Sequence, residues 1–284
     1  MNYRHEFHAG NFADVMKHTL LVILLQALNR KPSAWCYFDT HAGAGCYDLQ
    51  SKVALKSGES LSGIGRLWPH RSSAPVPVQQ LCEIIAEFNR DLPAVATPRY
   101  YPGSACLAAA LARGRDRLVL AELHPQEQRL LRERFRGDPR VAIHARDGYE
   151  MLKALVPPSE RRGLVLMDPP FEQSNEYQAQ LQALREAHAR WPTGVYALWY
   201  PIKDQAVVQG FYRKLARSGI GHLLVAELHL THAAAGFFGA CGMLMVNPPW
   251  QSDAAIKAML GYLAEVLAPG SGTSTVRWLV SNTQ

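Results

Sequence analysis

Short, uninterrupted apolar runs recur along this chain and alternate with longer stretches of helical periodicity. Strands that are apolar at consecutive positions are typical of sheets covered on both faces. The predicted core strands are 35–38, 118–121, 141–144, 164–167, 195–199, 223–228 and 243–246, and a last strand is expected at 275–280. The predicted helices between them include 105–113, 125–136, 149–155 and 176–190. This alternation predicts a doubly wound α/β fold.

One interval interrupts the alternation. No strand pattern is present between about residues 49 and 99. Residues 68–77 are rich in Pro and Ser, and residues 78–89 show helical periodicity. We therefore predict a small, mostly helical subdomain inserted after the first strand. The predicted main domain comprises residues 1–48 and 100–284, and the predicted insertion comprises residues 49–99.

The chain is moderately basic. Its 284 residues carry a formal net charge of +6, and its pI is about 9.1. This balance favours a polyanionic partner such as nucleic acid, although many proteins carry as much charge without one. The five cysteines are widely spaced and include no C-x-x-C pair, so neither a disulfide framework nor a zinc cluster is predicted. A reducing compartment, the cytoplasm, is the expected location.

The N-terminal segment is not typical of export. Residues 1–10 contain no apolar core, so no signal peptide is predicted. The apolar run at 20–25 is too short to span a bilayer. It lies inside a helical pattern, residues 13–28, that we expect to pack against the core, and no membrane association is predicted.

A glycine loop, Asp39-Thr-His-Ala-Gly-Ala-Gly45, follows the first predicted strand. A strand followed by G-x-G is typical of nucleotide-type sites, because glycines let the backbone approach a ligand at the carboxyl end of the strand. The third glycine of the dinucleotide-binding pattern is missing, and no Walker lysine follows. The loop therefore favours a cofactor without a pyrophosphate, of which S-adenosylmethionine is one.

Acidic residues follow the next two predicted strands. Glu122 stands where a carboxylate can accept both hydroxyls of a ribose. Its alternative role is that of an acid at a helix N-terminus, before His124-Pro125. Asp147 can accept from the amine of a cofactor adenine, and a simple Asp-Gly turn explains it equally well.

The most specific motif, Asp168-Pro-Pro-Phe171, follows the fourth predicted strand. Two prolines remove N–H donors, so the remaining polar groups are acceptors, the Asp168 carboxylate and the Pro169 carbonyl. Hydrogen bonds from an exocyclic amine to two acceptors localise its lone pair and make it nucleophilic. Asp168 can then hold or take the proton as positive charge builds on nitrogen. Phe171 offers a ring on which a purine can stack.

A second segment, Asn247-Pro-Pro-Trp250, matches the same pattern. It follows the seventh predicted strand, which usually runs antiparallel in sheets of this type. Its end is then expected at the edge opposite the ligand, because ligands bind outside the carboxyl ends of the parallel strands. We predict that this copy is not the catalytic one.

Basic and aromatic residues are concentrated before the first strand. They are Tyr3, Arg4, His5, His8, Lys17 and His18. This mixture of basic and aromatic residues suits a contact with nucleic acid. A solvent-exposed N-terminal arm and helix face would explain the same residues equally well. The pairs His5/His8 and His229/His232 have no carboxylate or thiol partner nearby in sequence, so no metal is predicted.

The order of the glycine loop, the two acids and Asp-Pro-Pro-Phe resembles the class I amino-methyltransferases. Five further segments sharpen the resemblance: Tyr3-Arg-His-Glu-Phe-His-Ala-Gly-Asn11, Ala13-Asp-Val-Met-Lys-His18, the glycine loop, Tyr100-Tyr-Pro-Gly-Ser104 and Ala197-Leu-Trp-Tyr-Pro201. Together they resemble the bacterial 23S rRNA adenine-N6 methyltransferase family known as RlmJ. The similarity runs nearly from end to end.

The resemblance implies a Rossmann-like class I methyltransferase sheet with the helical insertion. It also implies a monomer that acts on one adenine of 23S rRNA, best on protein-free RNA. The implied cofactor contacts are His18, His41, Ser104, Glu122, Asp147, Gly148 and Asp168, and Asp168 also touches the base. Tyr3 matches a tyrosine implicated in substrate contact. Phe171 departs from the family pattern, which often has Tyr there, and Cys46 stands where a basic residue can occur.

The predicted reaction is methyl transfer from S-adenosylmethionine to the N6 amine of an unstacked adenine, with Asp168 catalytic and Phe171 against the base. Arg66 and Arg71 of the insertion are expected to contact phosphates. Three alternatives remain open: a DNA adenine-N6 methyltransferase, a glutamine-N5 methyltransferase and a non-catalytic rRNA-binding assembly factor. Asp168 disfavours the glutamine enzyme, whose motif begins with Asn.

Overall fold

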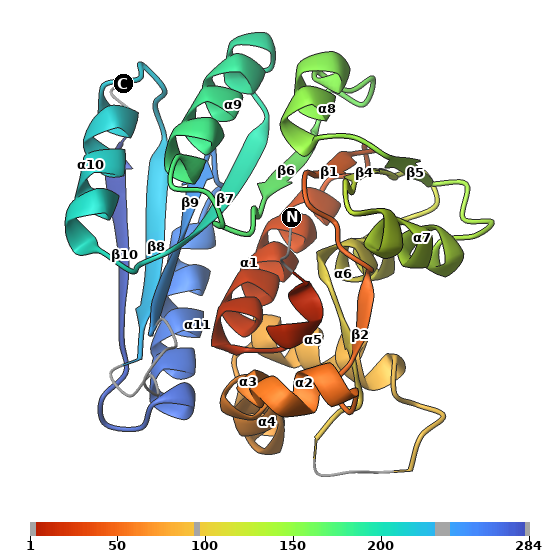
Figure 1. Ribbon diagram of the computed structural model, residues 1–284. Coiled ribbons are helices and arrows are strands. Elements are labelled where there is room, and N and C mark those ends of the chain that lie inside the picture. Colours follow the sequence, from red (N-terminus) through yellow and green to blue (C-terminus); the bar gives the residue numbers. More distant parts are fainter. Residues whose placement is uncertain (1–3, 94–96, 231–238, 282–284) are drawn as a thin grey trace.

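One central sheet with helices on both faces organises the chain (Figure 1). A computed structural model describes residues 4–93, 97–230 and 239–281, and within these ranges the sheet has eight strands. Their order across the sheet is β10 (Thr273–Val280), β8 (Leu223–His229), β9 (Ala240–Val246), β7 (Val195–Pro201), β6 (Gly163–Met167), β1 (Cys36–Asp39), β4 (Arg117–Ala121) and β5 (Val141–His144). The predicted α/β sheet is therefore present.

The strand directions define one functional edge. Strands β7, β6, β1, β4 and β5 pair in parallel, so their carboxyl ends lie at the same edge. Strand β9 pairs antiparallel with both β7 and β8, and β10 pairs antiparallel with β8. The prediction that the strand before Asn247-Pro-Pro-Trp250 runs antiparallel is confirmed. This second motif consequently begins at the opposite edge.

Two apolar layers enclose the sheet, because alternate strand residues point to opposite faces. Tyr37 and Leu118, for example, belong to one buried cluster, whereas Phe38 and Val119 belong to the other. The first layer contains α1 (Phe12–Asn29), α5 (Val76–Glu87), α6 (Ser104–Leu111), α7 (Pro125–Arg134) and α11 (Ser252–Leu267). The second contains α8 (Gly148–Leu155), α9 (Glu176–Arg190) and α10 (Gln205–Ala216).

Helix α1 is the central helix of the first layer. It packs against α5, α6 and α11, as Figure 1 shows around the N-terminal part of the chain. By length and composition its 18 residues could cross a membrane, but 83% of that window is buried inside the protein. The prediction that its apolar run packs in the core is confirmed.

The interval predicted as an insertion is helical where it is described. It contains α2 (Lys52–Ser57), α3 (Glu59–Ser62), α4 (Ile64–Leu67), the 3-10 helix η2 (Trp68–Ser73) and α5. The sequence did not predict a short antiparallel pair of strands, β2 (Cys46–Asp48) and β3 (Tyr100–Pro102), which lie directly before and directly after the predicted insertion. Buried side chains of α4 and α5 join the first apolar layer. The division into two domains stays a prediction.

Candidate active site

Two cavities meet at the carboxyl edge of the parallel strands. We call them the glycine-loop cavity, which Gly43, Ser104 and Glu122 help to line, and the aromatic cavity, which Phe171 and Trp199 help to line. Their empty volumes are about 810 and 840 Å³, including space open to solvent. Four residues line both: His5, Lys17, Asp168 and Pro170. Asp168 therefore lies at the junction of the two cavities.

The glycine loop adopts a backbone shape that glycine favours. Gly43 and Gly45 have φ angles of +61° and +82°. A Cβ atom on Gly43 would lie 2.1 Å from the Tyr47 hydroxyl. The Ala42 N–H donates to the Ala121 carbonyl at 3.0 Å, which ties the loop to β4. The loop is thus fixed at the carboxyl edge of the sheet, with its glycine backbone beside the cavity.

Glu122 joins the loop to the end of β4. Its carboxylate accepts from the N–H of Gly43 at 2.8 Å and from the N–H of His124 at 2.7 Å. Burial raises the pKa of this carboxyl above its ordinary value. The N–H of His124, the residue that precedes α7, is thus bonded to a side chain that also lines the glycine-loop cavity, and both interpretations of Glu122 stay open. Its contact with a ribose stays a prediction.

Asp147 and Gly148 begin α8 beside the same cavity. Asp147 Oδ1 accepts from the N–H groups of Tyr149 at 2.8 Å and Glu150 at 3.0 Å, and so caps the helix. A Cβ atom on Gly148 would lie 2.1 Å from the Thr40 carbonyl oxygen. Glycine therefore lets α8 approach the end of β1. Both residues line the glycine-loop cavity, and their contacts with a cofactor stay predictions.

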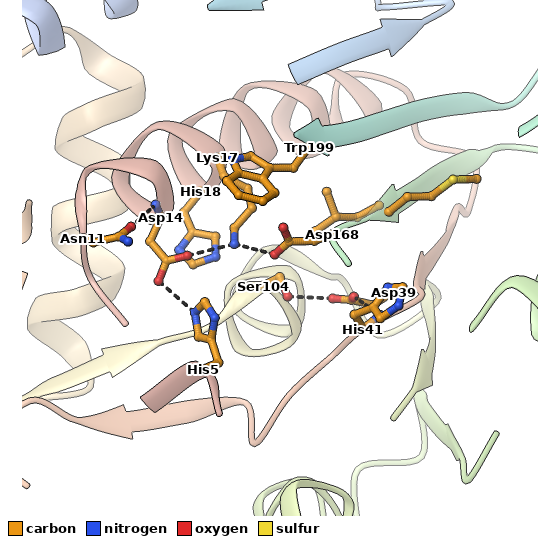
Figure 2. Close-up of polar contacts among 12 residues, drawn as sticks. His5, Asn11, Asp14, Lys17, His18, Asp39, His41, Ser104, Asp168 and Trp199 are labelled. Atoms are coloured by element: carbon orange, nitrogen blue, oxygen red, sulfur yellow. Dashed lines mark hydrogen bonds and ion pairs between the residues drawn. The ribbon is translucent and has the colours of Figure 1, made fainter. Parts of the chain in front are cut away.

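Asp39 is a buried organising residue that the sequence reading did not single out. Its Oδ2 accepts from the Ser104 hydroxyl and from the Tyr37 hydroxyl, each at 2.7 Å (Figure 2 shows the Ser104 bond). Its Oδ1 accepts from the His41 N–H at 3.2 Å. Burial raises the pKa of Asp39 to about 6. Asp39 thereby orients Ser104 and His41, two of the predicted cofactor contacts.

The predicted histidines of the glycine-loop cavity are uncharged at neutral pH. The His41 ring shares a hydrogen bond with the Thr40 hydroxyl at 2.7 Å, and burial lowers its pKa to about 4. His18 Nδ1 shares a hydrogen bond with the Tyr101 hydroxyl at 2.8 Å. Burial likewise lowers the pKa of His18 to about 3. Both line the cavity, and neither brings a positive charge to it.

Lys17 is the main residue whose role the sequence reading missed. Its ammonium lies between two carboxylates: it donates to Asp168 Oδ2 and contacts Asp14 Oδ1 at 2.8 Å (Figure 2). Burial alone would lower the pKa of Lys17, but Asp14 and Asp168 together outweigh it and raise this pKa above its ordinary value. The lysine is therefore charged and holds the Asp168 carboxylate in place.

This geometry corrects the interpretation of the basic segment. Lys17 and His18 were expected on a face that contacts nucleic acid or solvent, but they are only 4% and 1% exposed. The alternative of a solvated helix face is therefore wrong for both, because neighbouring helices surround α1, and their contact with nucleic acid stays a prediction. A signal was available: Asp14, Lys17 and His18 are polar residues in an apolar helix at spacings that place them on one face.

The residues before α1 fold back over the site. His5 begins a 3-10 helix (η1, His5–Phe7) and His8 follows it, and His5 Nε2 shares a hydrogen bond with Asp14 Oδ2 at 2.9 Å. His8 Nδ1 and Asn11 Nδ2 contact the two oxygens of Glu59, from the predicted insertion, at 2.8 and 2.9 Å. This N-terminal arm, residues 4–11, is thus held by α1 and by α3. Tyr3 lies outside the described residues.

Phe171 projects into the aromatic cavity from a strained backbone position. Its φ angle of +51° lies in the left-handed region, where a bulky residue is uncommon. Its ring makes edge contacts with Tyr177 and Trp199, at centroid distances of 4.9 and 5.8 Å. The ammonium of Lys17 lies 5.9 Å from the Trp199 ring centroid. Trp199 is a further lining residue that was not predicted.

Other predicted features lie away from the two cavities. Asn247 donates to the carbonyls of Pro192 and Gly194 at 2.8 and 2.9 Å, and so has a structural role. Arg66 and Arg71 are exposed, but each donates to a backbone carbonyl of this chain, and their phosphate contacts stay a prediction. Within the described ranges, there is no group of three or more His, Cys, Asp or Glu side chains that could hold a metal ion.

Comparison with known proteins identifies the family. A family described as "Ribosomal RNA large subunit methyltransferase D, RlmJ" matches residues 32–280. The chain belongs to this family. Two relatives are each described as ribosomal RNA large subunit methyltransferase J. The Escherichia coli K12 protein is 40% identical over 282 residues, 99% of each chain. The Haemophilus influenzae Rd protein is 39% identical over 284 residues, 98% of this chain and 99% of that protein.

Solved structures confirm the architecture expected of an RlmJ protein. A Legionella pneumophila Philadelphia 1 protein superposes with a TM-score of 0.87 at 35% identity, covering 95% of this chain and 98% of that one. A probable spermidine synthase from Corynebacterium glutamicum shares the fold, with a TM-score of 0.51 at 14% identity, and covers 97% of this chain and 77% of that one. The prediction of a Rossmann-like class I methyltransferase fold is confirmed.

Proposed function

We propose that this chain transfers a methyl group from S-adenosylmethionine to the N6 amine of one adenine in large-subunit, 23S ribosomal RNA. Family membership supports the reaction class. The observation that supports the amine is the position of Asp168, at the junction of the two cavities and held by Lys17. Following the resemblance, we propose that the protein acts as a monomer in the cytoplasm, best on protein-free RNA.

The glycine-loop cavity suits S-adenosylmethionine chemically. The glycine loop brings backbone to the cavity without side chains, because a Cβ atom on Gly43 has no room. Glu122 and Asp147 present carboxylate oxygens for ribose hydroxyls and an adenine amine, and Ser104 is oriented by Asp39. His18 and His41 complete the proposed set as neutral rings. When bound there, S-adenosylmethionine supplies an electrophilic methyl group.

The aromatic cavity suits the target base. Phe171 and Trp199 offer ring faces and edges to a purine that has left its stack. The Pro169 carbonyl and Asp168 Oδ1 remain as acceptors for the two N6 hydrogens, because Lys17 occupies Asp168 Oδ2. Both bonds pull electron density onto the amine nitrogen. The Lys17 ammonium holds the Asp168 carboxylate at the junction of the two cavities, where it can stabilise the charge that develops on N6.

Nucleoside analysis tests this proposal. Labelled S-adenosylmethionine is supplied with unmodified 23S rRNA, with DNA of the same sequence, and with ribosomal protein. We expect N6-methyladenosine in the RNA alone. Preferential labelling of DNA would show that the substrate is DNA and not RNA. Labelled glutamine in the protein would show that the substrate is not a nucleobase. Tight RNA binding without transfer to any substrate would favour a non-catalytic assembly factor.

A further inference from the structure

A basic groove lies between α9 and α10, in the second apolar layer and away from α1. Its empty volume is about 730 Å³, including space open to solvent. The residues that line it are Gln178, Leu181, Gln182, Arg185, Lys214 and Arg217. All charged members are therefore cationic. The acid nearest in sequence, Glu186, is already paired with Lys153 at 2.9 Å and with the Gln182 amide.

The three cations of this groove have their charges available. Arg185, Lys214 and Arg217 are exposed. Throughout residues 4–93, 97–230 and 239–281, none of the three side chains forms an ion pair or a hydrogen bond with another described residue. Lys17 at the site differs from them, because it lies between the carboxylates of Asp14 and Asp168. A cluster of uncompensated cations repels itself, so it favours an anionic ligand.

The groove begins beside the aromatic cavity. Helix α9 follows the Asp-Pro-Pro-Phe motif, and Tyr177 in its first turn packs on Phe171 and donates to the Pro201 carbonyl at 2.5 Å. Gln178, the next residue, lines the groove. Helix α10 follows the loop with Lys203, which lines the aromatic cavity. The two helices lie side by side (Figure 1), and each follows a residue of the aromatic cavity and contributes residues to the groove farther along its length.

We propose that this groove binds the phosphate backbone of the RNA strand that flanks the target adenine. This inference rests on the proposed function. The RNA strand would leave the aromatic cavity beside Lys203 and continue along the groove to Lys214 and Arg217. From the first residue of α10 to Lys214 the helix rises about 14 Å, a span that several successive phosphates cover. An apolar partner fits poorly, because Leu181 is the groove's one apolar lining residue and is itself buried.

A charge-matched pair of triple variants tests the proposal. The groove variant is Arg185→Gln/Lys214→Gln/Arg217→Gln. The control, Arg30→Gln/Lys31→Gln/Arg115→Gln, removes three exposed cations that lie before β1 and β4 and belong to neither α9 nor α10. We measure kcat and KM for 23S rRNA, and the salt dependence of RNA binding, for both variants and wild type.

We expect the groove variant to raise KM at least tenfold and to leave kcat unchanged. Each lost phosphate contact lowers the magnitude of the slope of log K against log salt by about 0.7 to 0.9, so the loss of three contacts lowers it by about 2 to 3. The defect should vanish on fragments too short to reach the groove. A slope and KM equal to those of the control would overturn the proposal. Because binding is measured separately, an enzyme inactive on rRNA would refute the proposed function, and the salt slopes of the two variants would still decide whether the groove binds RNA.

Discussion

The Lys17 ammonium is the feature on which the site most depends, so Lys17→Met is the most informative perturbation. Methionine keeps an unbranched apolar side chain of similar size and removes the ammonium group with its charge and its N–H donors. Asp14 and Asp168, whose side chains are 2% and 14% exposed, then lose the cation between them. The positive charge that offsets the burial of the two carboxylates is then absent, and the two negative charges are left close to one another.

The expected cost follows from this burial. Removing one partner of a buried ion pair typically costs about 3–5 kcal/mol, because the remaining charge is uncompensated. A domain is stable by only about 5–15 kcal/mol, so a large share of the free energy of unfolding would be lost. The double variant Lys17→Met/Asp14→Asn removes one of the two carboxylate charges and should recover part of that loss.

Urea unfolding measures these effects through the midpoint and the m-value. The control is Lys153→Met, which removes a lysine that is 54% exposed from its ion pair with Glu186. We expect a small change for the control, because exposed pairs contribute little. A Lys17→Met variant as stable as the control, or a double variant less stable than the single one, would refute the reasoning.

Three further perturbations have defined outcomes. Glu59→Gln should lower kcat about tenfold while RNA binding is kept, because it loosens the arm beside the cavity, and steady-state kinetics with a binding assay would check this. Gly148→Ala should weaken S-adenosylmethionine binding in calorimetry, since its Cβ would lie 2.1 Å from the Thr40 carbonyl oxygen. The pKa of His18 is lowered to about 3, so its contribution to stability is present above pH 6.5 and is lost as pH falls towards 3. His18→Gln should therefore flatten the loss of stability over that acid range in urea titrations.

The strands were predictable because their burial leaves a local signature. Both faces of β6 and β1 are covered, so nearly every position is apolar, Asp39 at the end of β1 being the exception, and the run stands out. The predicted strand at 195–199 was short by two residues, because Pro201 at the end of β7 is not a usual strand residue. Strands β2 and β3 were missed because each has only three residues, and their pairing depends on contacts across the insertion.

The site was predictable only where the sheet itself positions it. Glu122, Asp147 and Asp168 follow parallel strands, and the carboxyl ends of such strands meet at one edge. Lys17 and Asp168 are 151 residues apart, and their bond depends on how α1 packs against the sheet. Asp39 was visible in the glycine loop motif, but its bond to Ser104 spans 65 residues. The polar face of α1 was visible in the sequence, but the partner that Lys17 meets across the fold was not.

Single-turnover methyl transfer by Asp168→Ala tests the central claim most directly. The assay uses 23S rRNA and S-adenosylmethionine at saturation, with the binding of each measured separately and folding checked by urea unfolding. The account predicts a rate about 10² to 10⁴ times lower than that of wild type, with both ligands still bound. A rate within a few-fold of wild type would contradict it, because Asp168 could then not be the group that holds the reacting amine.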